Sequence, residues 1–172
     1  MSSEKILDAC CGSKMFWFNK DNPAAVFMDN RELECVLCDG RTLNIHPDMV
    51  ADFRSIPFED EHFSLVVFDP PHLTQAGEGS WLAKKYGVLS PDWKKDIATG
   101  FRECLRVLKE DGVLIVKWNE EQVTIGEFVK AVGFRPLFGN RMKEKKTIWL
   151  DYMKGVDSIA TLYDFEEGLN GQ

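Results

Sequence analysis

The feature that most constrains the fold is a series of short apolar runs that each lead into an aspartate. Asp8 follows Ile6-Leu7, Asp29 follows residues 24–28, Asp52 follows residues 49–51, and Asp69 follows residues 63–68. Runs this short and apolar are typical of buried β-strands. In an open α/β sheet, ligands bind beyond the carboxyl ends of the strands. We therefore expect four carboxylates along one edge of a sheet, where they would repel one another unless a ligand or a positive group organises them.

The remaining pattern predicts a mainly parallel sheet. Further strands are expected over 113–118, 134–138 and 146–152, and helices over 93–108, over 125–132 and directly after the first strand. Strands that alternate with helices indicate a parallel sheet with helices on both faces. The last two strands have only a short connection, so the final strand should be antiparallel. Asp39-Gly40 lies between two β-like runs and predicts a small β-hairpin insertion over 34–45.

Length and composition fit a single domain. The chain has 172 residues, of which 44% are hydrophobic, and we assign residues 1–154 to the domain and 155–172 to an acidic C-terminal tail. No run reaches the ~20 apolar residues that span a bilayer, and no secretory signal is visible at the start. Five cysteines with an adjacent pair do not indicate a disulfide framework, so we expect a cytoplasmic protein. Cys35 and Cys38 lack a second pair of ligands at a regular spacing, so no metal site is predicted.

The sequence Asp69-Pro70-Pro71-His72 directly follows the apolar run 63–68. Proline fixes φ and disfavours helix at the residue before it, so a rigid corner with free carbonyl groups is expected at the end of a strand. This corner resembles the D-P-P-[YFWH] motif of S-adenosylmethionine-dependent amino-methyltransferases, and the whole chain is similar to small phage-type DNA adenine methyltransferases. The resemblance implies the class I methyltransferase fold, which is α/β and Rossmann-like, with a seven-stranded sheet and a reversed last strand.

The resemblance also implies where S-adenosylmethionine would bind. Residues 6–13 are similar to the glycine-rich first motif of the family, with Lys14 where a further glycine is common. Asp29 lies 21 positions after Asp8, near the ~20-residue spacing of a ribose-hydroxyl acceptor. Asp52 matches the acid of the family that contacts the adenine amine of the cofactor. The expected cofactor-binding residues are Asp8, Ala9, Cys10, Gly12, Asp29, Asp52, Phe53 and Asp69. Helix N-capping is the alternative for Asp29 and Asp52.

The expected catalytic residues are Asp69, Pro70, Pro71 and His72. The Asp69 carboxylate and the Pro70 carbonyl would accept the two hydrogens of an amine, so that its nitrogen becomes tetrahedral as it attacks the methyl group. His72 would stack on the target base, a contact worth ~1–3 kcal/mol; a role as general base is the alternative.

A long segment, 72–92, is predicted to be a substrate loop without helical periodicity. It and the last inter-strand connection combine basic and aromatic residues, which suit a strand of nucleic acid. The expected substrate-binding residues are Trp81, Lys84, Lys85, Tyr86, Lys117, Arg141 and Lys143. The net charge of −7 argues against bulk electrostatic coating of nucleic acid, but not against a local patch.

We expect transfer to adenine N6, with DNA favoured over RNA, and either a homodimer or a complex with a specificity partner. An RNA base (adenine N6 or guanine N2), cytosine N4, and a catalytically idle cofactor-binding subunit are the alternatives.

Overall fold

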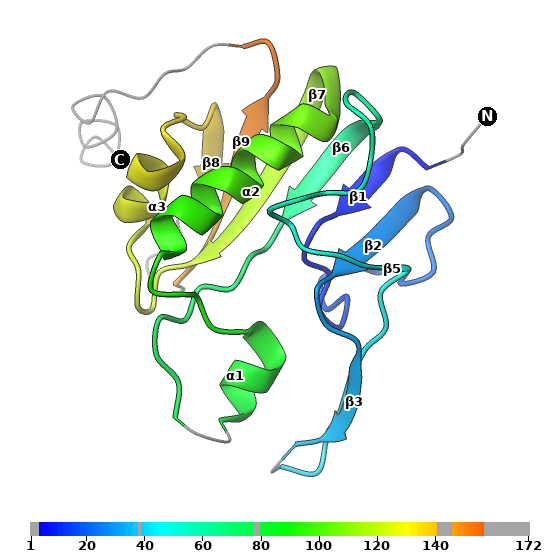
Figure 1. Ribbon diagram of the computed structural model, residues 1–172, viewed down its shortest axis with the longest axis vertical. Helices are drawn as coiled ribbons and strands as arrows, with labels where there is room; N and C mark the ends of the chain where they lie inside the picture. The colour runs from blue at the N-terminus through cyan, green and yellow to red at the C-terminus, as the bar shows by residue number, and fades with distance from the viewer. Residues whose placement is uncertain (1–3, 38, 78–79, 141–145, 157–172) are drawn as a thin grey trace.

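The computed structural model describes residues 4–37, 39–77, 80–140 and 146–156, and a seven-stranded sheet forms its centre (Figure 1). The strands are β1 (Ile6–Asp8), β2 (Ala25–Asp29), β5 (Met49–Val50), β6 (Phe63–Phe68), β7 (Leu108–Asn119), β8 (Phe138–Asn140) and β9 (Thr147–Met153). Their order is β5-β2-β1-β6-β7-β9-β8. All neighbours are parallel except β9, which is antiparallel to both β7 and β8. The predicted seven-stranded, mostly parallel sheet with a reversed last strand is confirmed.

Two helices, α2 (Trp93–Val107) and α3 (Ile125–Val132), lie side by side on one face of the sheet (Figure 1). The buried side of α2 includes Ile97 and Phe101, four residues apart, as a helix that packs on a sheet requires. A capping box starts α3: Thr124 Oγ1 accepts from the Glu127 N–H, and the Glu127 carboxylate accepts from the Thr124 N–H. Each fully buried phenylalanine or leucine here stabilises the fold by about 1.5–3 kcal/mol.

The opposite face of β1 and β2 is covered by a loop. The prediction of a helix after the first strand is wrong, because no helix forms within residues 9–24. Gly12 and Lys14 both have positive φ, 51° and 53°, which a right-handed helix does not allow. Trp17 covers this face of the sheet in place of a helix: its ring packs edge-on against Phe27, with the ring centroids 4.9 Å apart. Cys11 and Ala25 belong to the same small cluster.

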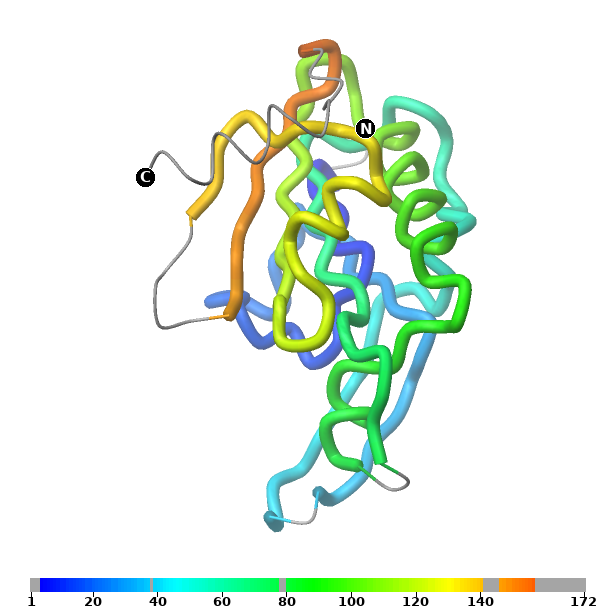
Figure 2. Tube along the Cα trace, turned by 90° about the vertical axis from the view of Figure 1, so that its left-hand side faces the viewer, coloured from blue at the N-terminus to red at the C-terminus, as the bar shows by residue number. Residues whose placement is uncertain are grey.

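A hairpin and a short helix extend from the carboxyl ends of the strands (Figures 1 and 2). The hairpin pairs β3 (Leu33–Val36) with β4 (Thr42–Ile45), which confirms the prediction. The helix is α1 (Trp81–Tyr86), in a segment expected to lack one. Six residues are less than two helical turns, too few to produce a visible period. The two elements share a separate small core in which Trp81 packs against Leu37, Leu43 and Ile45.

The strand expected over 134–138 begins only at Phe138. Phe134 instead stacks on Phe101, with the ring centroids 5.4 Å apart, and Pro136 has no N–H for a ladder. Of the predicted tail, only Gly155 and Val156 belong to the described residues. Among the helices of the described ranges, none has the length and apolar character needed to cross a membrane.

Candidate active site

Three of the four expected aspartates come together at the carboxyl ends of the central strands. Asp8 ends β1 between β2 and β6, and Asp69 follows the last residue of β6. The negative charges of Asp69 and Asp29 both raise the pKa of Asp8. Parallel pairing produces this arrangement, since it aligns the ends of neighbouring strands at one edge.

Asp8 is fully buried and holds the loop that follows β1. Its Oδ2 accepts a hydrogen bond from Trp17 Nε1 at 2.7 Å, and its Oδ1 accepts one from the Cys10 N–H at 3.3 Å. Burial raises the pKa of Asp8 to about 7, the Trp17 bond opposes this rise, and Asp69 and Asp29 add to it. Asp8 does not line the pocket described below. Its observed hydrogen bonds therefore hold the loop after β1 in place.

The first loop, residues 9–13, positions Gly12 beside Asp29. The Gly12 N–H donates to Asp29 Oδ2 at 2.9 Å, while Ala9 is buried. The positive φ of Gly12 suits glycine, which has no Cβ to clash. Lys14 adopts the same left-handed region. The loop therefore accommodates Lys14 in a backbone conformation that favours glycine.

Asp29 is 4% exposed and already has several partners. Besides Gly12, it accepts hydrogen bonds from the backbone N–H of Arg31 and from Arg31 Nε, both at 3.0 Å. A ribose hydroxyl could reach this carboxylate only by replacing part of the Arg31 contact. Helix capping, the alternative for Asp29, does not occur, because the next element after β2 is the hairpin strand β3 and not a helix.

Asp52 and Phe53 lie beyond the end of β5 and do not line the pocket. Asp52 pairs with Arg54, with Oδ2 2.6 Å from Nη2, and this hydrogen bonding lowers the pKa of Asp52 below its ordinary value. Arg54 also reaches Asp96 on α2 at 3.2 Å. The Phe53 ring contacts Phe68 edge-on, with the centroids 5.5 Å apart. Both residues thus connect this edge of the sheet to α2, Asp52 through Arg54 and Phe53 by lying against Gly100.

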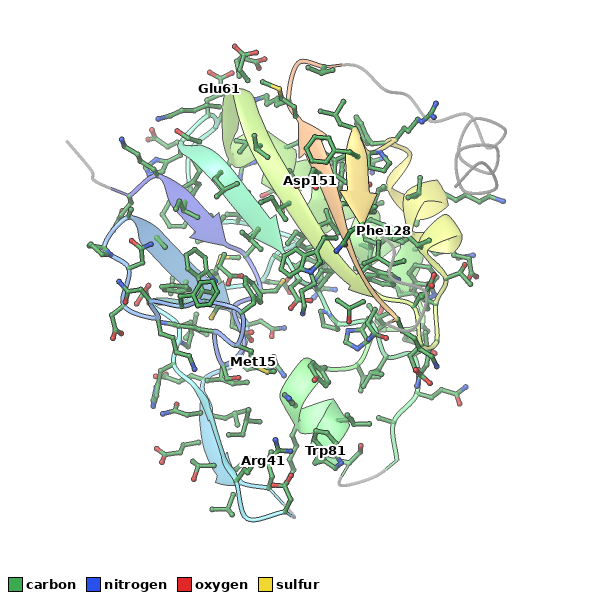
Figure 3. The ribbon with its side chains drawn as sticks, turned by 180° about the vertical axis from the view of Figure 1, so that it is seen from behind. Met15, Arg41, Glu61, Trp81, Phe128 and Asp151 are labelled. Atoms are coloured by element: carbon green, nitrogen blue, oxygen red, sulfur yellow. The ribbon has the colours of Figure 1, made fainter. Side chains whose placement is uncertain are left out.

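A pocket of about 520 Å³ opens where the first loop, the residues after β6, α1 and the ends of β7 and β9 meet. It brings together eight of the predicted residues: Cys10, Gly12, Asp69, Pro70, His72, Lys85, Tyr86 and Lys117. Sequence reasoning missed ten lining residues: Cys11, Ser13, Met15, Phe16, Arg31, Leu73, Leu82, Asn119, Glu121 and Thr147. Asn119 and Arg31 could have been found, because each lies within two residues of the end of a strand at this edge. Figure 3 shows Met15 between the sheet and α1.

Asp69 to His72 form the rigid corner that the two prolines predict. The Asp69 side chain is 19% exposed and pairs through Oδ2 with Nζ of Lys117. Burial raises the pKa of Asp69, and Lys117 opposes that rise. Pro71 packs close to Gly87 at the end of α1, where an added Cβ would lie 3.1 Å from Pro71 Cγ. Pro71 is therefore a support for α1 and does not line the pocket.

His72 is buried and neutral near pH 7. Burial, with a smaller effect of Lys117, lowers its pKa to about 4, so it is a weak base. Its ring lies 5.2 Å from that of Tyr86, at an angle of 52°. The two rings form one aromatic wall of the pocket.

Of the other residues expected to bind substrate, Lys85 lines the pocket, whereas Trp81 and Lys84 do not. Trp81 packs on the hairpin, with Arg41 5.9 Å from its ring centroid (Figure 3). The Lys84 carbonyl accepts a hydrogen bond from Arg31 Nη1 at 3.1 Å. Lys85 lies 4.9 Å from the Tyr86 ring centroid and lines the pocket. Arg141 and Lys143 lie outside the described residues.

No protein-family model matches the chain, and no curated protein matches its sequence. The chain is similar in structure to a SAM-dependent methyltransferase from Methanosarcina mazei, with a TM-score of 0.51, 12% identity, and 91% of this chain and 95% of that chain covered. A TehB-like SAM-dependent methyltransferase from Corynebacterium glutamicum gives a TM-score of 0.52 at 15% identity, over 90% and 81%. The cyclase SpnF gives 0.53 at 13%, over 90% and 75%. The chain thus has the fold of SAM-dependent methyltransferases, and because a cyclase shares it, the activity must be argued from the site.

Proposed function

We propose that this protein is an S-adenosylmethionine-dependent methyltransferase that acts on an exocyclic amine of a nucleic-acid base, with adenine N6 in DNA as the favoured target. The observation that carries the proposal is the corner formed by Asp69, Pro70 and His72. It presents a carboxylate and an aromatic ring to one pocket, which the first loop also lines. The shared fold supports the choice of cofactor.

The residues at this edge fit such a cofactor. Gly12 leaves its surroundings open, since an added Cβ would meet nothing within 4 Å. The Asp29 carboxylate beside it can accept hydrogen bonds from ribose hydroxyls if the Arg31 guanidinium gives up part of its contact with Asp29. Asp52 and Phe53 follow the next strand end but lie outside the pocket, so the adenine of the cofactor would contact them only if Asp52 exchanged its Arg54 partner. Bound there, the cofactor would supply a methyl group activated by a sulfonium charge.

The chain's own residues would position the amine. The Asp69 carboxylate and the Pro70 carbonyl accept its two hydrogens, so the nitrogen lone pair is directed away from the corner. His72 and Tyr86 provide a ring surface for the base, and stacking of one base is worth about 1–3 kcal/mol. The nitrogen loses its proton after methyl transfer, when it has become cationic, and Asp69 is the adjacent acceptor.

A nucleic-acid substrate is supported by the groups at the pocket. Lys85 and Arg31 bring positive charge to its wall beside the aromatic pair, in a protein whose net charge is −7. A base within a duplex would have to leave the stack to reach the corner. DNA is favoured over RNA because Asp69 to His72, with the preceding strand ends, resembles DNA amino-methyltransferases.

The test is methyl transfer from labelled S-adenosylmethionine to unmethylated DNA and RNA, each single- and double-stranded. Asp69→Ala is compared with Asp21→Ala, which changes an exposed aspartate that does not line the pocket. Label recovered as N6-methyladenine in DNA, lost in Asp69→Ala and kept in Asp21→Ala, is the expected result. Label in RNA or on another amine would correct the substrate. Cofactor binding without transfer to any polymer would refute a stand-alone enzyme on nucleic acid and point to a missing partner or to a substrate other than nucleic acid.

A further inference from the structure

Lys117 is placed directly beside the corner by the pairing of two central strands. In the parallel register, Phe68 of β6 faces Val116 of β7. Asp69 directly follows Phe68 and Lys117 directly follows Val116, and their side chains form the ion pair through Asp69 Oδ2. The lysine was expected to bind substrate, but its observed partner is the candidate catalytic carboxylate.

The Lys117 amine lies close to an aromatic ring as well as to Asp69. Its Nζ is 5.5 Å from the ring centroid of Phe16. Phe16 contacts Trp149 edge-on at 5.5 Å, and Trp149 is the cross-strand partner of Lys117 in β7 and β9. The Lys117 side chain is only 22% exposed. Its amine is therefore held beside Asp69 at the wall of the pocket.

The surroundings of Asp69 oppose its negative charge. Burial favours the neutral carboxyl and raises the pKa of Asp69. The charge of Asp69 in turn helps to raise the pKa of Asp8 and of Cys10, and His72 is neutral and supplies no positive charge. Lys117 is thus the cation that acts on Asp69 within the described residues. A protonated carboxyl would lose one of the acceptor positions that an amine needs.

We propose that Lys117 is a positioning residue that holds Asp69 ionised through Oδ2 and leaves Oδ1 to accept the hydrogen of the substrate amine. In the described part of the chain, Oδ1 takes part in no hydrogen bond. The amine and the lysine therefore share one carboxylate, each with its own oxygen. The role in methyl transfer rests on the proposed function, whereas the effect of Lys117 on Asp69 does not.

The first measurement is independent of any substrate. Carbon-13 NMR of the aspartate carboxyl carbons follows the titration of Asp69, whose signal is assigned by its loss in Asp69→Asn. We expect Lys117→Met to move this titration upward by about one pH unit or more, since an opposite charge within about 6 Å lowers a carboxyl pKa by about 1–3. Lys117→Arg should keep it near the wild-type position. Lys109→Met, which changes an exposed lysine at the start of the same strand, should leave it unchanged.

The second measurement is the pH profile of methyl transfer. We expect Lys117→Met to lower kcat at neutral pH by about tenfold for each pH unit by which the Asp69 titration moves above neutrality, with recovery at higher pH and little change in KM. A tenfold rise in KM with an unmoved Asp69 titration would overturn the proposal and make Lys117 a substrate contact. If Lys117→Met does not fold, Lys117→Gln replaces it. If the wild type transfers no methyl group, the proposed function fails, while the NMR titration still decides the role of Lys117.

Discussion

Replacing Asp8 by asparagine should change how stability depends on pH, because this carboxyl is fully buried and has a pKa of about 7. Its ordinary pKa is near 3.9, so the folded state holds a proton that the unfolded state has released. Folding is therefore favoured at low pH, and that stabilisation is lost as pH rises through 7. For these two pKa values, linkage gives a loss of about 2.5 kcal/mol between pH 5 and pH 8, and about 4 kcal/mol over the whole titration.

The assay is urea unfolding followed by far-UV circular dichroism at several pH values, with Asp8→Asn beside the wild type. His72, whose pKa is lowered to about 4, contributes a trend of opposite sign below pH 6.5, but it is present in both proteins and cancels in their difference. The wild type should lose its stability relative to Asp8→Asn as pH rises. A difference that stays constant within about 0.5 kcal/mol from pH 5 to pH 8, smaller than the linkage value, would refute the reasoning.

Three further outcomes are expected. Gly100→Ala should lose about 1–3 kcal/mol from overpacking, since the new Cβ would lie 2.3 Å from a ring carbon of Phe53. Gly126→Ala, on α3 with open space around it, should instead gain up to about 1 kcal/mol, and equal effects in urea unfolding would contradict this account. His72→Phe should retain kcat within about fivefold, whereas His72→Ala should lose about tenfold or more if the ring contributes only stacking. A His72→Phe variant as inactive as Asp69→Ala would assign proton transfer to the histidine.

The sheet could be predicted from sequence because its strands are buried, and burial leaves a direct mark on composition. Phe63–Phe68 matches the predicted strand residue for residue, and Ile125–Val132 matches the predicted helix. Segment 9–24 was predicted wrongly because tertiary contacts hold it as a loop, among them the hydrogen bonds from Trp17 to Asp8 and from Gly12 to Asp29. The apolar spacing of a chain carries no sign of such a bond.

The corner was predictable, but the internal partners of its acids were not. Prolines and strand ends are local features, so Asp69 and Asp29 could be placed at one edge. Their pairing with Lys117 and Arg31 depends on side-chain geometry. The same applies to α1, which is positioned by its contact with the hairpin and has too few residues to show a period.

Arg31 bridges two parts of the site that ligands would use separately. Its guanidinium contacts Asp29 at 3.0 Å and the Lys84 carbonyl of α1 at 3.1 Å. A ligand that takes the Asp29 oxygens competes with Arg31 and so loosens its hold on α1, which carries Tyr86 into the pocket. By linkage, whatever shifts α1 must change the affinity at Asp29 by the same factor. Arg31 therefore couples the affinity for a ligand at Asp29 to the position of α1.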